Sequence, residues 1–454
     1  MNRDLLVIGG GVAGTAVAAE AARLGASVTV VESDERLGGS GALSAGILWT
    51  VPDAETFARV CPHGDPALGA ALADGFDEAV ERVRAEGVEV SERWHGQMGY
   101  GVAHRIDIHA LLDTWRARIE GAGGRIALAT SARELVVEEG EVSGARVDGT
   151  DGEETIRAGA VVLATGGFQG DPELLRAHIG PGAEAMVLRS NPHSAGDGFR
   201  LGLAAGAAPS AALDSFYGHL LPSPLAELSP EQFLPLTQYH SKACILVNRF
   251  GRRFTDESRG DEVSNQALLR QPGARAVLLC DERVRLEHAV GAPYPHGQVL
   301  DRLELAREAG ARIVSRDSLD GLARAVGEWG VNGERLRVTL ARYEAAAPGT
   351  GDDDGVPVPA DPYPLREPPF HALEVQPSIT FTYGGLRADA DGHALDAQGE
   401  PVPGLFVAGA DLGGLQETGY VGGLVLGLVF GPRIAAAALE GRDRDLQGAG
   451  ASNG

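Results

Sequence analysis

Asp4-Leu5-Leu6-Val7-Ile8-Gly9-Gly10-Gly11-Val12-Ala13-Gly14 is the stretch of the sequence that decides the fold. It is an apolar run followed by glycines in the spacing G-x-G-x-x-G, and Ala16 to Leu24 then continues with helical periodicity and no proline. A second apolar run, Ser27 to Val31, ends in Glu32. Because the order is strand, tight turn, helix, strand and acid, the sequence predicts a Rossmann-like dinucleotide-binding unit.

The glycine turn at residues 9–14 and Glu32 are expected to bind different parts of a dinucleotide. Glycines let the backbone approach a pyrophosphate, whose negative charge then lies at a helix N-terminus. The residues expected to form this part of the site are Gly9, Gly11, Val12, Ala13 and Gly14. Glu32 is placed to accept hydrogen bonds from the adenosine ribose, and an acid there disfavours a 2′-phosphate. The predicted ligand is therefore FAD or NAD.

A loop of small residues, Gly38 to Gly46, favours FAD. Its backbone amides can reach the rest of the pyrophosphate and the edge of an isoalloxazine ring. Further along, Ala160 to Gly167 is typical of a buried parallel strand that ends in a Thr-Gly-Gly turn. The cofactor contacts expected from these two segments are Gly38, Gly39, Ser40, Ser44, Ala164, Thr165 and Gly166.

The end of the chain completes this prediction. Gly404 to Asp411 contains a short apolar run, and Gly419 to Leu424 opens a long apolar helix. Together with the glycines at the start of the chain, these segments indicate one dinucleotide site built from both termini, which is how a flavin is held. The contacts expected here are Gly409, Asp411, Gly423 and Leu424.

The chain resembles the flavoprotein family of fumarate reductase, succinate dehydrogenase and 3-ketosteroid Δ1-dehydrogenase. The motifs that carry the resemblance lie in family order: Gly9–Gly14 with Glu32, Gly38–Trp49, Ala164–Gly167, Ala195–Gly198, Asn248–Phe254, Tyr383–Leu386 and Pro403–Gly409. The resemblance implies an α/β fold, in which a discontinuous Rossmann-like FAD domain of the glutathione-reductase type receives an inserted α+β substrate-capping domain. We expect the FAD domain at residues 1–205 and 372–446, the capping domain at 206–371, and a disordered tail at 447–454.

The resemblance also bears on how FAD is held. Succinate dehydrogenases attach it through a histidine just after the Gly-Gly loop, and residues 38–52 contain no histidine. We therefore expect non-covalent FAD. The family usually has glutamate directly after Ala-Gly, where this chain has Ala410. Asp411, one step later, is the residue expected to hydrogen-bond the ribitol.

Departures from the family pattern argue against a dicarboxylate substrate. Phe381 stands where fumarate reductases have a histidine, and Tyr420 where they have an arginine. An ungapped match puts Asp261 at their proton-donating arginine, and residues 237–242 lack the glutamate and arginine of their cap. Few groups remain to clamp two carboxylates, so fumarate and succinate are poor substrate predictions.

The ketosteroid-dehydrogenase branch fits better. Ala42 to Trp49 is similar to that family's Ala-x-Ser-Gly-Gly-x-x-Trp run, and Tyr420 stands at its carbonyl-polarising tyrosine. The family's glycine four residues later is Leu424 here, which still offers a backbone N–H. The resemblance implies that the Tyr420 hydroxyl and the amides of Gly423 and Leu424 stabilise a developing enolate, while a hydride passes to flavin N5.

The base that removes the α proton is expected from the inserted domain. Our first candidate is Tyr217, because Phe216-Tyr217-Gly218-His219 falls where the family's cap enters the site. His219 and His240 follow. Arg259, two residues before the family's catalytic arginine position, is a further candidate as a cap-closing residue.

Composition limits the possible partners. With 44% apolar and 22% charged residues, the 454-residue chain is typical of a soluble globular protein. A net charge of −24 without any run of Lys or Arg argues against nucleic acid and anionic membrane surfaces. Three distant cysteines offer neither a redox pair nor a metal cluster, and no metal site is expected.

Two apolar segments resemble membrane elements. Leu5 to Ala22 is better explained by the glycine motif than as a leader. Thr418 to Pro432 has only 15 residues, whereas a membrane span needs about 20, so we expect a buried helix. A cytoplasmic location is the resulting prediction.

Three functional hypotheses remain open. The first is an FAD-dependent desaturase that acts next to a carbonyl, on a steroid-like or other apolar ketone or acid. The second is an ene-reductase of an activated double bond, fed by an external donor. The third is a flavin-binding protein without turnover. The sequence predicts a small-molecule substrate and leaves the electron acceptor or donor unknown.

Overall fold

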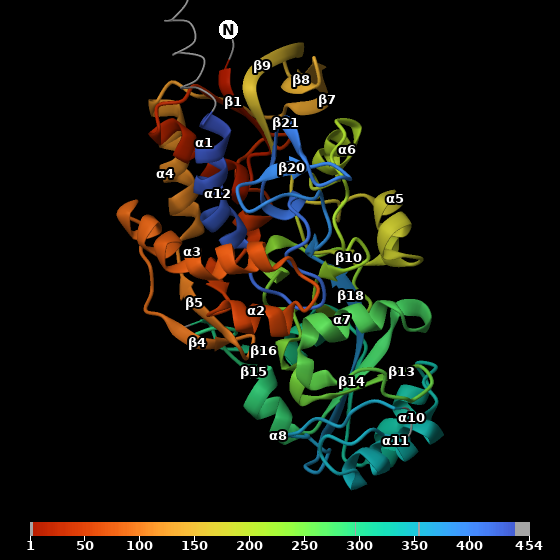
Figure 1. Ribbon diagram of the computed structural model, residues 1–454. Coiled ribbons are helices and arrows are strands. Elements are labelled where there is room, and N and C mark those ends of the chain that lie inside the picture. The colour runs from red at the N-terminus through yellow and green to blue at the C-terminus, as the bar shows by residue number, and fades with distance from the viewer. Residues whose placement is uncertain (1–2, 296, 353–354, 441–454) are drawn as a thin grey trace, which may run out of the picture. The chain divides into compact units, whose positions relative to one another are not determined.

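Strand β1 (Arg3–Ile8) pairs in parallel with β2 (Val28–Val31) on one side and with β9 (Gly152–Leu163) on the other, within an eight-stranded sheet. Leu5 to Ile8 are buried, as expected of a strand whose sheet is covered on both faces. The computed structural model describes residues 3–295, 297–352 and 355–440, and Figure 1 shows the arrangement of their helices and strands.

The C-terminal part of the chain joins this sheet. β21 (Pro401–Val407) pairs in parallel with β9, so that only β9 separates it from β1. β20 (His393–Leu395) pairs antiparallel with β21 at one end of the sheet, and β6 (Arg125–Ala127) pairs in parallel with β2 at the other. The predicted Rossmann-like α/β fold is confirmed.

Helix α1 (Val12–Arg23) packs against both α4 (Ile108–Gly121) and α12 (Leu424–Leu439), as Figure 1 shows. Glycines of α12 allow this close approach. A Cβ added at Gly427 would lie 2.9 Å from the Ala13 Cα, and one at Gly431 would lie 2.8 Å from the Ala16 Cβ. The helices that follow the two dinucleotide motifs are therefore in direct contact.

The last helix begins and ends later than the sequence predicts. Residues 418–423 are not helical, and α12 continues past Pro432 to Leu439. Gly422 has φ of 109°, and a Cβ there would lie 2.2 Å from the Trp49 carbonyl oxygen. This left-handed turn against Trp49 keeps the preceding residues outside the helix, and the apolar pattern does not reveal it.

The remaining elements of this part surround the sheet. A second sheet joins β3 (Ile47–Thr50), β5 (Gly101–Arg105) and β4 (Trp94–Gln97). Strands β7 (Ser131–Glu138) and β8 (Glu141–Gly149) extend the main sheet in antiparallel fashion from β9. The other helices are α2 (Ala54–Val60), α3 (Pro66–Ala85), α5 (Pro172–Leu174) and α6 (Asp197–Ala204).

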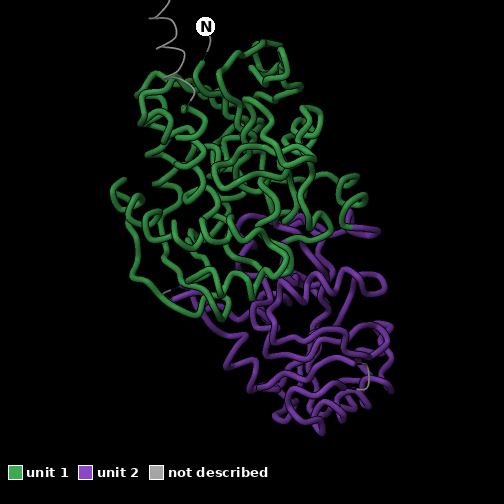
Figure 2. Tube along the Cα trace, in the orientation of Figure 1, with its two compact units in different colours: residues 1–179, 190–216, 381–454 green, residues 180–189, 217–380 purple. Residues whose placement is uncertain are grey.

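The chain divides into two compact units, coloured separately in Figure 2. Unit 1 comprises residues 1–179, 190–216 and 381–454, and unit 2 comprises residues 180–189 and 217–380. The predicted boundaries, 205/206 and 371/372, lie about ten residues earlier on each side, and they place residues 180–189 in the FAD domain. The predicted tail at residues 447–454 lies outside the described residues.

Unit 2 is built on β18 (Phe370–Ile379), a fully buried strand. Phe370 and Ala372 contribute to one hydrophobic core, and Leu373 and Val375 to another, because alternate residues of a strand point to opposite faces. The strands of this sheet are β10 (Val187–Leu188), β12 (Leu220–Pro222), β13 (Ile245–Asn248), β14 (Ala276–Cys280) and β17 (Ile313–Arg316).

The helices of unit 2 are α7 (Asp261–Leu269), α8 (Glu282–Val284), α9 (Arg302–Glu308), α10 (Leu319–Gly327) and α11 (Gly333–Ala345). A small antiparallel pair, β15 (Val290–Gly291) and β16 (Leu300–Asp301), precedes α9. Two-residue strands stand where the chain passes between units: β11 (Phe216–Tyr217) and β19 (Phe381–Thr382).

Candidate functional site

The three motif glycines of unit 1 have three different steric environments. Gly9 has φ of 107°, and a Cβ there would lie 2.2 Å from the Ala164 carbonyl oxygen. A Cβ at Gly14 would lie 1.9 Å from the Gly9 carbonyl oxygen, whereas one at Gly11 would meet no atom within 4 Å. Gly9 makes the tight turn and Gly14 brings helix and strand together, while Gly11 leaves open the space that a pyrophosphate needs.

Glu32 lies beside this turn at the end of β2. Its carboxylate accepts hydrogen bonds from the backbone N–H of Gly10, at 2.6 Å, and of Asp34, at 2.7 Å. The side chain is 6% exposed. Oε1 also accepts from Ser33 Oγ at 3.3 Å, so the carboxylate is held in one orientation, and Oε2 has a second lone pair with which to accept from a ribose hydroxyl.

The small-residue loop meets the same turn. The Gly38 N–H donates to the Gly10 carbonyl at 2.9 Å, and a Cβ at Gly39 would lie 3.3 Å from the Gly11 Cα. A Cβ at Gly41 would lie 2.4 Å from Val12 and 3.3 Å from Leu424. Three segments that are distant in the sequence therefore converge, as expected from the glycine patterns at both ends of the chain.

The loop's serines make protein contacts of their own. Ser40 Oγ lies 2.6 Å from Ser190 Oγ and accepts from the Asn191 N–H at 3.1 Å. Ser44 Oγ donates to the Gly41 carbonyl at 2.7 Å. These bonds fix the loop and leave the roles of Ser40 and Ser44 toward the cofactor as predictions.

Asp411 joins the C-terminal segment to the Thr-Gly-Gly turn. Its carboxylate accepts from the Thr165 N–H, from Thr165 Oγ1 at 2.9 Å and from the Gly167 N–H at 3.1 Å, next to Gly166. Burial raises the pKa of Asp411, and these bonds act in the opposite direction. Nearby, a Cβ at Gly409 would lie 2.7 Å from the Ala13 Cβ. The contact of Asp411 with ribitol stays a prediction.

Three α-helices in the described part of unit 1, α1, α6 and α12, lack a capping side chain at their start. Gly11 precedes α1 and Gly423 precedes α12, and neither residue can cap a helix with its side chain. By contrast, Asp53, Asp65 and Asp107 cap α2, α3 and α4. Uncapped N-termini attract anions. The open space at Gly11 and the uncapped starts of α1 and α12 therefore fit a dinucleotide with a flavin.

An aromatic cluster lies at the start of α12. The Tyr420 ring is 5.0 Å from the Trp49 ring and 6.0 Å from the Phe381 ring, and its side chain is 9% exposed. The Tyr100 hydroxyl donates to the Tyr420 carbonyl at 2.8 Å. A Cβ at Gly423 would lie 3.3 Å from the Tyr420 hydroxyl oxygen. The Tyr420 ring thus lies among aromatic rings, and its hydroxyl lies next to the first turn of α12.

Unit 2 contains a buried acid–imidazole pair. His219 Nδ1 lies 2.6 Å from Asp261 Oδ2, and the two side chains are 1% and 4% exposed. The rings of Tyr217 and Tyr239 stand edge-on to the His219 ring, at 4.8 and 5.2 Å. Burial lowers the pKa of His219, and the Asp261 carboxylate opposes that shift. A neutral His219 whose Nδ1–H donates to Asp261 has Nε2 available as a proton acceptor.

The other two candidates, His240 and Arg259, differ in burial. His240, in the short 3-10 helix η5 (Tyr239–Ala243), is 2% exposed, and burial lowers its pKa to about 3. Arg259 ends the 3-10 helix η6 (Glu257–Arg259), and it is exposed. Sequence reasoning had not included Asp261, Glu262, Tyr239 or Arg302 among the site residues. The only signal was Asp261, in the family's arginine position.

Glu262 gives unit 2 a measurable pH signature. Burial raises the pKa of Glu262 to about 8, and the Asp261 charge acts in the same direction. Folding therefore takes up a proton, so stability falls as pH rises from the ordinary value of about 4.3 to about 8. His240, whose folded pKa is lowered, loses stability only as pH falls below about 6.5. Between roughly pH 6.5 and 8, the pH dependence of stability therefore reports on Glu262 and not on the buried histidines.

We expect the Glu262→Gln variant to lose this signature. Between pH 6.5 and 8, the free energy of unfolding of the wild type should fall by about 2 kcal/mol relative to that of the variant. Urea unfolding at several pH values measures the difference. Two curves that stay parallel across the window would show that Glu262 is ionised throughout it.

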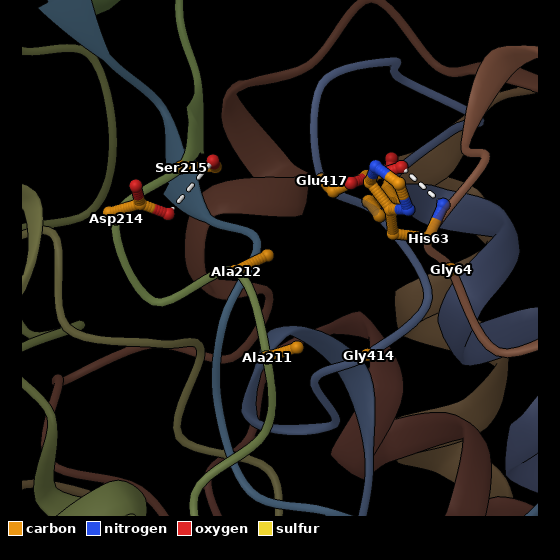
Figure 3. A pocket seen from close by; sticks show the side chains of 9 residues that line it. His63, Gly64, Ala211, Ala212, Asp214, Ser215, Gly414 and Glu417 are labelled. Carbon is orange, nitrogen blue, oxygen red and sulfur yellow. Dashed lines mark hydrogen bonds between the residues drawn. The ribbon is translucent and has the colours of Figure 1, made fainter.

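A cavity of about 170 Å³ opens elsewhere in unit 1, lined by residues that Figure 3 shows. On one side the backbone N–H of His63 donates to the Glu417 carboxylate at 2.6 Å, and on the other Ser215 Oγ donates to Asp214 at 3.3 Å. The cavity contains none of the predicted site residues. Gln416, which also lines it, accepts from the Val421 N–H at 2.9 Å and so steadies the turn next to Tyr420.

The described residues contain no helix long and apolar enough to cross a membrane. Across residues 3–295, 297–352 and 355–440, no three His, Cys, Asp or Glu side chains are grouped to hold a metal ion. All three cysteines are buried and free. The cytoplasmic location stays a prediction.

Comparison with known proteins places the chain among flavoproteins. The model of the family described as FAD binding domain matches residues 4–425. The fumarate reductase (cytochrome) of Shewanella frigidimarina is 28% identical over 450 residues, covering 92% of this chain and 74% of that protein. The 4-oxocyclohexanecarboxylate 2-dehydrogenase of Sinomonas cyclohexanicum is 25% identical over 561 residues, covering 99% and 94%.

A solved structure agrees on the fold. The crystal structure of 3-ketosteroid Δ1-dehydrogenase from Sterolibacterium denitrificans, in complex with 1,4-androstadiene-3,17-dione, matches with a TM-score of 0.75. The identity is 20%, and the match covers 96% of this chain and 99% of that chain.

Proposed function

The chain belongs to the FAD binding domain family and binds FAD, and from this premise we propose that it desaturates a CH–CH bond next to a carbonyl. The broader class is plain: it is an FAD-dependent oxidoreductase of CH–CH or C=C bonds, as its relatives are. The reaction direction and the carbonyl substrate are our proposal. These relatives are enzymes, so the hypothesis of a flavin-binding protein without turnover has no support.

Tyr420 is the observation that carries the proposal. A dicarboxylate substrate needs cations, but the start of α12 offers a phenol hydroxyl among the rings of Trp49 and Phe381. A hydroxyl donor beside aromatic rings suits the oxygen of a ketone. As the α proton leaves, charge develops on that oxygen, and a fixed donor stabilises it most where water is excluded. The N–H groups of Gly423 and Leu424 would add to this stabilisation.

The proton and the hydride leave from adjacent carbons. Bound FAD supplies the hydride acceptor. The α proton goes to a base, and we assign this role to His219, with Tyr217 beside it. Asp261 accepts from Nδ1–H and so leaves the lone pair of Nε2 available. His240 is the weaker candidate, because its pKa of about 3 makes it a poor proton acceptor.

Asp261→Asn tests this assignment. The asparagine amide can donate to Nδ1, which would place the ring proton on Nε2 and remove the acceptor. We expect kcat to fall by roughly 10²- to 10⁴-fold, with the flavin content unchanged. In the wild type, kcat/KM should fall as pH drops through the pKa of His219, below about 6.5.

Asp256→Asn is the matched control, because it changes a nearby carboxylate that caps η6 and asparagine can also cap. It should leave kcat within a few-fold of the wild type. Equal activity of Asp261→Asn and the wild type would remove the His219–Asp261 pair from the proton transfer.

The second candidate function is the reverse reaction, reduction of an activated C=C bond. It is favoured by the relative at 28% identity, a fumarate reductase. The same residues would serve in reverse, with Tyr420 polarising an enone and His219 delivering the proton.

Arg259, exposed in η6, is proposed only to assist closure of the substrate domain, and an Arg259→Ala variant should change KM more than kcat.

Product analysis distinguishes the two directions. The enzyme is incubated with cyclic ketones and an artificial electron acceptor, and in parallel with the matching enones and a reduced dye. Mass spectrometry should find ketone products two mass units lighter, formed faster than the enones are reduced. Turnover of enones alone would establish the reductase and overturn the proposed direction.

A further inference from the structure

Arg302 is a buried cation whose hydrogen-bonding capacity is only partly used. It is the first residue of α9 and is 2% exposed. Nη1 donates to the Ala289 carbonyl at 3.2 Å and to the Gly291 carbonyl at 3.4 Å. Nε and Nη2 have no hydrogen-bond partner among the residues that the structure describes.

The other two buried arginines of unit 2 are fully bonded. All three nitrogens of Arg253 donate, to acceptors that include Glu257 and Asp352, and the guanidinium lies over the Tyr343 ring. Arg189 also donates from all three nitrogens, to the Phe233 carbonyl and to Thr380. Arg302 therefore differs from both of these arginines, because its Nε and Nη2 have no hydrogen-bond partner among the described residues.

An uncompensated guanidinium is costly, because it stays charged when buried and desolvation costs several kcal/mol. Asp261 is the acid that acts on Arg302 electrostatically, yet its Oδ2 is bonded to His219. No carboxylate in the described part of the chain lies within ion-pair distance of Arg302. The site thus has a fixed positive charge and two adjacent unused donors.

Two residues near Arg302, Tyr239 and His240, are polar but uncharged. Its Cζ lies 5.4 Å from the centre of the Tyr239 ring. His240, which follows Tyr239, has no partner at either ring nitrogen among the described residues, and the charge of Arg302 helps to keep it neutral. A neutral imidazole offers one donor and one acceptor.

We propose that Arg302 binds a carboxylate of the substrate through Nε and Nη2, with His240 as an additional donor. Those two nitrogens form the fork that matches a carboxylate in bidentate fashion. The substrate class is then a keto acid, in which one carboxylate accompanies the carbonyl. This inference rests on the proposed function for the ketone, whereas the binding of the carboxylate is independent of it.

The test compares two probes of the same shape on the FAD-loaded protein: cyclohexanecarboxylate and the neutral cyclohexanecarboxamide. Isothermal calorimetry gives Kd, and the shift in Tm gives a second measure. The wild type should bind the carboxylate roughly 10- to 100-fold more tightly than the amide, as expected for hydrogen bonds to a charged group. Equal Kd values for the two probes in the wild type would overturn the proposal.

Arg302→Met should remove the preference for the carboxylate, and Arg302→Lys should keep part of it. Arg307→Met, an exposed position on the same helix whose side chain pairs with Glu304, is the control and should retain the preference. Equal weakening of both probes by Arg302→Met would assign Arg302 a structural role and overturn the proposal. Tight carboxylate binding without flavin reduction by any ketone would support this inference and contradict the proposed function.

Discussion

Replacing Tyr420 by phenylalanine is expected to lower kcat for a saturated ketone by roughly 10²- to 10³-fold, with little change in KM. The variant loses one donor to the developing enolate oxygen and keeps the ring that packs on Trp49. Because the hydroxyl acts on charge that is largest in the transition state, the loss should appear mainly in kcat. Stopped-flow measurement of flavin reduction isolates this step.

Tyr100→Phe is the matched control. It removes a hydroxyl from the same aromatic cluster, but one that donates to the Tyr420 carbonyl rather than to the substrate. We expect a change of less than about ten-fold, from a slight loosening of the turn. Normal turnover by Tyr420→Phe would remove Tyr420 from the mechanism and leave the FAD assignment untouched.

Gly11→Ala should fold normally and lose flavin. The added methyl group would meet no protein atom within 4 Å, and the φ of −68° at Gly11 suits alanine. If a pyrophosphate occupies that space, the methyl group crowds it, and we expect FAD to bind roughly 10- to 100-fold more weakly. The flavin-to-protein absorbance ratio after desalting measures this loss, and circular dichroism checks the fold.

Two further glycines bracket the result. Gly121→Ala, at the end of α4, also adds a methyl group in open space and should keep its flavin. Gly14→Ala should fail to fold well, because its Cβ would lie 1.9 Å from the Gly9 carbonyl oxygen. Wild-type flavin content in Gly11→Ala would mean that the phosphates do not pass beside Gly11.

The predicted cofactor-binding turn could be read from the sequence, because its contacts join residues that lie close together in the chain. The close contact of Gly14 with Gly9 and the bond from the Gly10 N–H to Glu32 follow from one strand-turn-helix-strand unit. The contact of Ala13 with the segments around Gly409 and Gly427 was predictable from the glycine patterns near both ends of the sequence. The start of α12 was misplaced, because an apolar pattern does not reveal the left-handed turn at Gly422.

The polar cluster of unit 2 could not be assembled from the sequence. His219 and Asp261 are 42 residues apart, and they come together only through the packing of α7 near β18. Arg302 belongs to no motif, and its significance depends on burial and on bonds that it does not make. The sequence alone shows neither that Arg302 is buried nor that its Nε and Nη2 lack hydrogen-bond partners.

Anaerobic titration of the FAD-loaded protein tests the central claim most directly. Saturated cyclic ketones, with and without a carboxylate, and succinate are added in turn while the flavin absorbance band is followed. We expect a saturated ketone to bleach the band and succinate to leave it unchanged. Bleaching by succinate alone would contradict the proposed ketone desaturation.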